Sequence, residues 1–188
     1  EIEKQLAEDD TGNDATLDVF AVIDRSGSMY GPRLNNVKQS LKYLLDLLKP
    51  TDRISIIIFD DKAETLLAPK LVGKSRALIE QAIDSIQDRS STDIRSGLRR
   101  AFEEMLKRKS KNQVTGVLLL SDGQDNQFFR KGGAIVDTFF EEWSAKLKDH
   151  EHTVHTFGYG DDHDETLLDQ IAKCKGGNFY YVKDLELV

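Results

Sequence analysis

Short apolar runs alternate with longer amphipathic stretches along most of the chain. Nearly continuous apolar runs, the pattern of strands buried on both faces, occur at residues 17–24, 53–59, 114–120 and 153–159. Apolar residues recur at helical spacing in residues 33–48, 75–86, 92–107, 134–147 and 165–172. A weaker run at 63–68, which Asp60-Asp61 joins to 53–59, predicts the outer strand of a hairpin at a sheet edge, and 179–182 predicts a last strand.

This alternation predicts an α/β fold: a doubly wound, mostly parallel, Rossmann-like sheet of six strands with one antiparallel edge strand and helices on both faces. Right-handed crossovers restrict the topology, and the commonest doubly wound order, 3-2-1-4-5-6, makes the first and fourth strands neighbours. Ligands of such sheets bind beyond the carboxyl ends of these two strands. Residues 1–15 are acidic and aperiodic, so we expect a flexible leader before one domain spanning residues 16–188.

The composition fits one globular domain and narrows the choice of ligand. Of the 188 residues, 39% are hydrophobic and the formal net charge is −7, which argues against nucleic-acid binding. No apolar run approaches the roughly 20 residues that span a bilayer, so membrane insertion is not expected. The single Cys174 excludes an internal disulfide and favours a reducing, intracellular compartment. Because the chain begins with Glu1, we expect it to be part of a larger multidomain protein.

Oxygen-bearing side chains follow the two strands that the topology makes neighbours. Asp24, Ser26 and Ser28 stand at the end of the first strand, and Asp122 stands at the end of the fourth. Thr92 opens a predicted helix, and the topology can bring it to the same edge of the sheet. Carboxylates and hydroxyls suit a hard divalent cation, with Mg²⁺ expected and Ca²⁺ or Mn²⁺ as alternatives. If the carboxylates act mainly through water, the ion stays under-neutralised and attracts an external anion.

The order of these residues resembles the von Willebrand factor type A domain, also called the integrin I-like domain, over roughly residues 16–182. That family holds a cation at a metal-ion-dependent adhesion site, which is built from a D-x-S-x-S motif, a threonine and an aspartate on three loops. Here Asp24-Arg25-Ser26-Gly27-Ser28 matches the motif, and Thr92 and Asp122 match the other two positions. Ser90-Ser91 departs from the family, in which glycines often precede the threonine.

The resemblance implies how each of these residues would bind the cation and what the domain does. Ser26 and Ser28 would bind the cation directly, Asp24 and Asp122 directly or through water, and Thr92 in either mode depending on the conformational state. We therefore expect a non-enzymatic, adhesion-type module for protein–protein interaction, in which an Asp or Glu carboxylate of a partner completes the coordination. Flanking side chains are expected to form the partner-facing rim: Met29, Tyr30, Gln124, Asp125 and Asn126.

A metal-dependent hydrolase or phosphoryl-transfer enzyme is the alternative, because a Lewis-acidic ion can polarise a phosphate. The residues offer it little: no second aspartate stands two residues after Asp24, and no lysine or histidine falls near the expected site as a general acid or base. Neither glycine-rich nucleotide-binding motif follows the first strand, and the G-x-S-x-G elbow of serine hydrolases is missing.

Each candidate ligand also has a purely structural interpretation. Ser26 and Ser28 are typical of turns, Thr92 is favoured as a helix N-cap, and Asp122-Gly123 is an ordinary turn pair. Only the convergence of all three segments at one edge of the sheet favours a metal site over these separate explanations.

Two further polar clusters invite a metal interpretation. Residues 161–164 are acidic, but an N-cap at Asp162 or Asp164 for the following helix is favoured over a second cation site. Three histidines stand near the fourth apolar run, but alternation places His152 and His155 on opposite faces of that strand. We therefore expect core or solvent-exposed histidines there.

Overall fold

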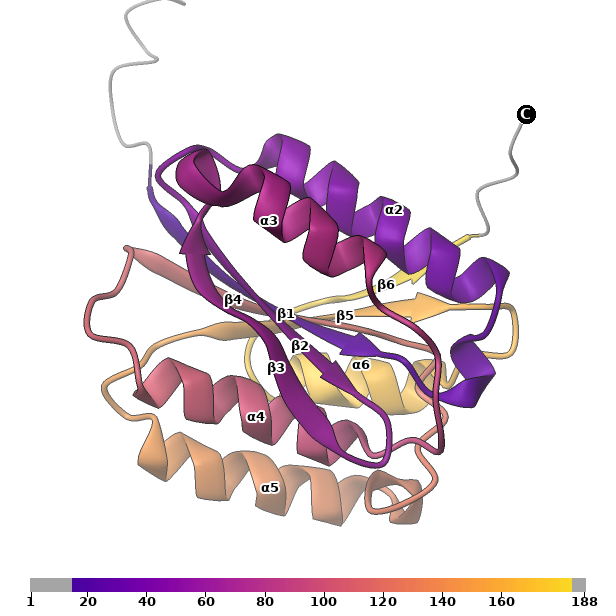
Figure 1. The fold of residues 1–188 in the computed structure, drawn as a ribbon. Helices are drawn as coiled ribbons and strands as arrows, with labels where there is room; N and C mark the ends of the chain where they lie inside the picture. The colour runs from indigo at the N-terminus through magenta and orange to yellow at the C-terminus, as the bar shows by residue number, and fades with distance from the viewer. Residues whose placement is uncertain (1–14, 184–188) are drawn as a thin grey trace, which may run out of the picture.

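The computed structural model describes residues 15–183, in which six strands form one sheet in the order β3-β2-β1-β4-β5-β6 (Figure 1). Only β3 runs antiparallel to its neighbour. This confirms the predicted fold class and strand order, whereas the predicted leader lies almost wholly outside the described residues. The strands are β1 (Leu17–Asp24), β2 (Arg53–Phe59), β3 (Ala63–Leu71), β4 (Val114–Ser121), β5 (Thr153–Tyr159) and β6 (Phe179–Val182).

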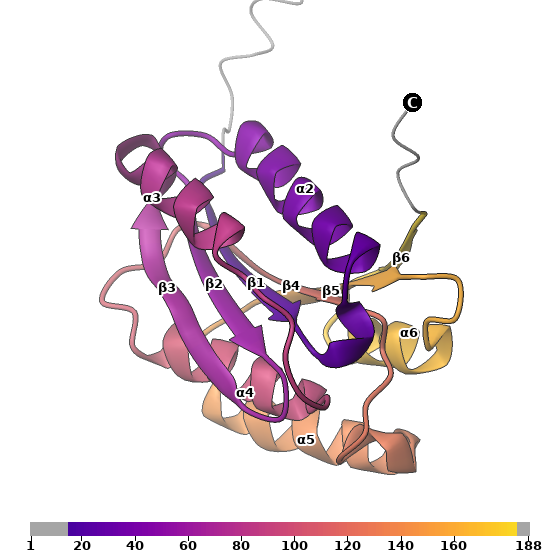
Figure 2. The ribbon, with the colours of Figure 1, turned by 45° about the vertical axis from the view of Figure 1, so that its right-hand side comes forward.

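The helices cover the sheet in two layers, as Figures 1 and 2 show. Two pack on one face, α2 (Pro32–Leu47) and α3 (Val72–Asp84). Three pack on the other, α4 (Ile94–Leu106), α5 (Gly133–Lys146) and α6 (Glu165–Lys173). No helix between residues 15 and 183 has the length and apolar content that a membrane crossing requires.

β1 lies at the centre of the molecule and contributes to two separate hydrophobic cores. Val19, Ala21 and Ile23 pack toward α2 and α3, whereas Phe20 and Val22 pack toward the opposite helices. Because both faces of the strand are covered, residues 19–23 form a continuous apolar run and not an alternating one. This position, between β2 and β4, also puts the end of β1 where the winding of the sheet reverses.

The edge hairpin extends further than the sequence predicts. β3 runs to Leu71 instead of ending at residue 68, so that Pro69 lies inside the strand. An edge strand tolerates proline because one row of its backbone amides needs no partner in the sheet. α3 follows at once and begins at Val72, three residues before the predicted start at Ser75. Both differences concern element ends, which local patterns define least well.

Candidate functional site at the carboxyl edge of the sheet

The ends of β1 and β4 lie side by side, as the predicted topology requires. The register pairs Ile23 with Leu120, so Asp24 and Ser121 terminate adjacent strands. The Ser121 hydroxyl donates a hydrogen bond of 2.6 Å to Oδ2 of Asp24, whose side chain is fully buried. The first candidate ligand is therefore oriented by the strand that carries the last one.

The loop after β1 turns back on the Asp24 carboxylate. The backbone amide of Ser26 donates to Oδ1 of Asp24 at 2.8 Å, and the Oγ atoms of Ser26 and Ser28 lie 3.2 Å apart. Ser26 is buried, whereas Ser28 is exposed at the mouth of the site. One carboxylate and two hydroxyls of the D-x-S-x-S motif thus occupy a single short loop, and each adds an oxygen atom.

Thr92 lies in the loop before α4 and does not cap that helix. The N-cap is Asp93, whose Oδ1 accepts a hydrogen bond of 3.2 Å from the amide of Ser96. Thr92 is buried, and its carbonyl accepts from the amide of Asn126 in the loop after β4. Because the carbonyl of Ser90 accepts from Gly27, this loop contacts both other loops of the site.

Asp122 follows β4 directly, and its side chain is fully buried. Its Oδ1 accepts a hydrogen bond of 3.0 Å from the amide of Gln124, and its Oδ2 lies 3.3 Å from Nη1 of Arg33. The turn depends on Gly123, which adopts φ +74 and in which a Cβ would approach the carbonyl oxygen of Asp164 to 2.9 Å. Within Ser121-Asp122-Gly123, the glycine is therefore required by the packing of the loop, whereas the serine and the aspartate supply polar groups.

Two buried carboxylates at this edge repel one another. Burial first, and then the negative charge of Asp122, raise the pKa of Asp24 from its ordinary value of 3.8 to about 7. Hydrogen bonds from Ser121 and Ser26 oppose this rise only in part. No group of three or more His, Cys, Asp or Glu side chains suited to a metal occurs in the described part of the chain. A cation at this edge would therefore take its remaining ligands from hydroxyls.

Asp60, in the turn between β2 and β3, was not identified from the sequence as part of the site. Its buried Oδ2 accepts from Nε of Arg25 at 2.9 Å and from Nε of Arg89 at 3.2 Å, and its carbonyl accepts from the amide of Asp93. It thereby ties the loop after β1 to the loop that carries Thr92. The only sequence signal is an arginine inside the D-x-S-x-S motif, which offers a charge to some unidentified carboxylate.

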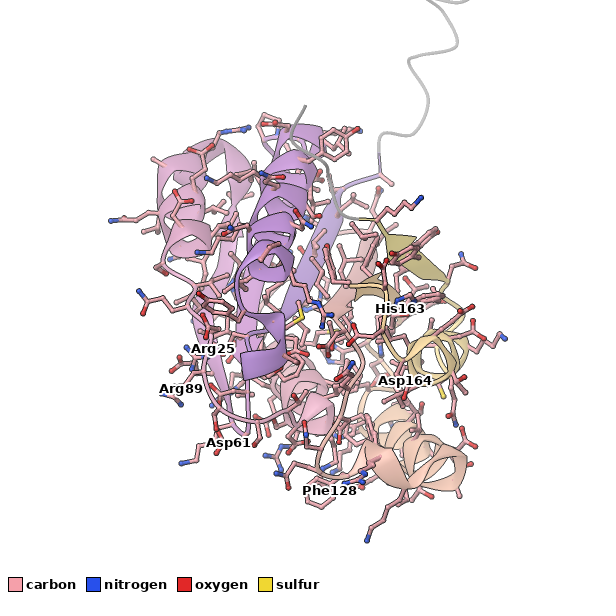
Figure 3. The ribbon with its side chains drawn as sticks, turned by 90° about the vertical axis from the view of Figure 1, so that its right-hand side faces the viewer. Arg25, Asp61, Arg89, Phe128, His163 and Asp164 are labelled. Carbon is pink, nitrogen blue, oxygen red and sulfur yellow. The ribbon has the colours of Figure 1, made fainter. Side chains whose placement is uncertain are left out.

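Figure 3 looks onto this edge of the sheet and shows which groups surround the site. Arg25 and Arg89 lie with Asp61 near the β2–β3 turn, and His163 lies on the opposite side, toward α6. Phe128 marks a third side, near α5, where the guanidinium of Arg95 stacks 3.2 Å from the centre of its ring. The site is therefore ringed by charged and aromatic side chains from five of the segments that connect strands and helices.

The structure corrects the predicted rim at two positions. Met29 is fully buried in the core beneath α2, so it offers no surface to a partner. Asp125 is also buried, and its Oδ2 accepts a hydrogen bond of 2.8 Å from the amide of Ile94 at the start of α4. Tyr30 is 72% exposed and Asn126 is exposed, as a rim requires. Gln124 is half-buried, and its Nε2 donates to the carbonyl of Asp162.

The other polar clusters are occupied by local contacts. Asp164 caps α6, because its Oδ1 accepts a hydrogen bond of 3.0 Å from the amide of Leu167. The ring of His152 packs 5.3 Å from that of Phe102 in the core. On the other face of the strand, Nδ1 of His155 accepts from the amide of Asn178.

The fold and the polar groups at its switch point define an α/β binding domain. The chain matches the von Willebrand factor type A domain over residues 18–188, and it belongs to that family. The Synechocystis sp. protein sll0103 is 32% identical over 180 residues, which cover 94% of this chain but only 40% of that relative.

Solved structures agree on the fold. A von Willebrand factor type A protein from Catenulispora acidiphila has a TM-score of 0.74 at 21% identity. The match covers 90% of this chain and 39% of the Catenulispora chain. The pilus adhesin SpaC from Lactobacillus rhamnosus GG has a TM-score of 0.68 at 16% identity, over 91% of this chain and 28% of SpaC. These structures support the fold, and the match over residues 18–188 confirms the predicted family.

Proposed function

We propose that this domain binds a partner protein through a divalent cation, with Mg²⁺ the expected ion. Asp24, Ser26, Ser28, Thr92 and Asp122 would hold the cation, and an Asp or Glu side chain of the partner would complete its coordination. The observation that carries this proposal is the pair of fully buried carboxylates, Asp24 and Asp122, at the end of two adjacent strands.

The chemistry of the donor set fits a hard cation. Its carboxylate and hydroxyl oxygens are the ligands that Mg²⁺, Ca²⁺ and Mn²⁺ prefer, whereas zinc favours nitrogen and sulfur. The raised pKa of Asp24 indicates that this buried carboxylate has too little positive charge nearby. A dication supplies that charge, and as a Lewis acid it also attracts an anionic group from outside.

The surrounding residues would hold the ligands in place before the cation arrives. Ser121 orients Asp24, and Asp60 fixes the loop of Thr92 against the loop of Ser26. Ordered outer groups of this kind raise the affinity of metal sites because the ligands lose less freedom on binding. Tyr30 and Phe128, both exposed beside the site, would contribute the apolar surface that the partner contacts.

Membership of the family and the likeness to a pilus adhesin support a protein-interaction module. The name of SpaC describes an adhesin, and the same fold there forms part of a longer chain.

Calorimetric titration with MgCl₂ alone tests the cation site. The wild-type domain should take up one cation, and Asp24→Asn and Ser28→Ala should bind it at least about tenfold more weakly, because each removes one ligand oxygen or its charge. Ser75→Ala, on α3 at the opposite edge of the sheet, is the matched control and should bind like the wild type. Equal uptake by Asp24→Asn and the wild type would contradict the proposal.

Partner binding is tested by affinity capture with the immobilised domain. Captured proteins should elute with chelator, and immobilised Asp24→Asn should fail to retain them. Proteins that stay bound in chelator, or that bind Asp24→Asn equally well, would show an interaction that needs no cation.

A further inference from the structure

The side chain of Arg33 reaches from the first turn of α2 across the mouth of the candidate site. Its Nη1 donates to the carbonyl of Ser28 at 3.2 Å and lies 3.3 Å from Oδ2 of Asp122. Its Nη2 forms an ion pair with Asp162 in the loop after β5. One guanidinium thus connects all three loops that follow β1, β4 and β5.

The fold makes room for this arginine. Gly160 adopts φ +87, and a Cβ at that position would come within 2.5 Å of the guanidinium. Gly31 and Pro32 start α2 immediately before Arg33, which sets where the side chain leaves the helix. The Arg33 side chain is only 24% exposed, so its charge is partly removed from water. The contact with Asp122 is therefore a packed ion pair and not a chance meeting of surface groups.

The same carboxylate that Arg33 contacts is one of the five candidate cation ligands. A guanidinium and a dication on one carboxylate repel each other, and partial burial strengthens this repulsion. A cation bound to Asp24 and Asp122 also supplies the charge that Arg33 otherwise supplies to Asp122. Arg33 and the cation therefore oppose one another at this site.

We propose that Arg33 is the resident counterion of Asp122 and competes with the divalent cation for that carboxylate. Arg33 thereby sets the cation affinity of the site, and cation uptake weakens its hold on the loop of Asp162. This inference rests on the proposed function. It adds a residue outside the D-x-S-x-S motif that tunes when the site is loaded.

Calorimetric titration of Arg33→Gln with MgCl₂ alone is the first test. Removing the competing charge should tighten cation binding by about tenfold, which is the effect of a partly buried charge pair of moderate strength. The matched control is Arg76→Gln on α3, because Arg76 also pairs with two carboxylates, Asp46 and Glu80, but lies near the opposite edge of the sheet. The control should stay within about twofold of the wild type, since distant charges are screened by salt.

Urea unfolding in chelator is the second test and requires no cation. Arg33→Gln should lower the unfolding midpoint, because Asp122 then loses its counterion. The same substitution should have a clearly smaller effect in an Asp122→Asn background, because there is no charge left to compensate. Equal losses in both backgrounds would overturn the pairing of Arg33 with Asp122.

The outcomes separate the two proposals. If the wild type binds Mg²⁺ and Arg33→Gln binds it equally or more weakly, the competition is overturned and the cation site stands. If no variant takes up a cation, the proposed function falls and the competition falls with it, whatever the unfolding data show about the ion pair.

Discussion

Each end of β1 carries a buried aspartate, and the two differ in how their negative charge is compensated. Asp18, near the amino end, accepts hydrogen bonds from Nε of Arg53 at 2.7 Å and from Nη1 of Arg108 at 2.7 Å. It accepts a third from the amide of Asn112. Within residues 15–183, Asp24 at the carboxyl end accepts only from Ser26 and Ser121, and the negative charge of Asp122 acts on it.

Under the proposed function, this difference separates a structural charge from one that is kept for a cation. Burying an ion is costly unless opposite charges and hydrogen bonds compensate it, and Asp18 has both. Asp24 has hydrogen bonds from neutral groups but no cation of its own. Sites that bind ligands commonly sacrifice stability in this way, because groups poised for a partner are left unsatisfied without it.

The largest effect on stability is expected at the amino end of β1, where the charge of Asp18 is compensated. Asp18→Asn should lower the free energy of unfolding by about 3–5 kcal/mol, because it leaves two arginine side chains in the protein without their counterion. Urea unfolding at neutral pH measures this loss, with Asp88→Asn at an exposed loop position as the control. A loss below about 1 kcal/mol, typical of surface pairs, would remove the contrast on which the comparison depends.

At the carboxyl end of β1, removing the charge of Asp24 should have the opposite effect on stability. The folded-state pKa of Asp24, about 7, lies above its ordinary value of 3.8, so the proton stabilises the folded protein. In chelator, the wild type should lose stability relative to Asp24→Asn as the pH rises from about 4 to about 7, by an amount of the order of a few kcal/mol. Urea unfolding curves of both proteins across this range measure it. A stability difference between the two proteins that does not change with pH would show that the charge of Asp24 is compensated.

A smaller effect on stability is expected at Asp60, which also holds the loops of the candidate site together. Asp60→Asn weakens the links of that carboxylate to Arg25 and Arg89 and should cost about 1–3 kcal/mol of stability. It should also weaken Mg²⁺ binding several-fold, since the loop of Thr92 is then held less firmly. Calorimetry and urea unfolding on one preparation give both values. Lost stability with unchanged Mg²⁺ affinity would confine Asp60 to a structural role.

Much of the fold could be predicted from residue patterns because burial follows local periodicity. The runs at 17–24 and 53–59 are mostly apolar since helices cover both faces of these strands, and the helix that connects them allows them to pair in parallel. The candidate ligands could be predicted because Asp24 ends one buried strand and Asp122 directly follows another. Element ends such as Leu71 of β3 could not, because edge pairing depends on neighbours outside the segment.

The amino-acid sequence by itself determined the α/β class, the strand order and the five candidate ligands, since each depends on short-range patterns and on general rules of chain connection. Only the tertiary structure decided that Met29 and Asp125 are buried, and that Arg33 and Asp60 join the site. The reason is physical: Arg33 and Asp122 stand 89 positions apart, and whether two such charges meet depends on loop packing in three dimensions. Periodicity shows which face of an element is buried, but it carries no information about which polar groups meet across its end.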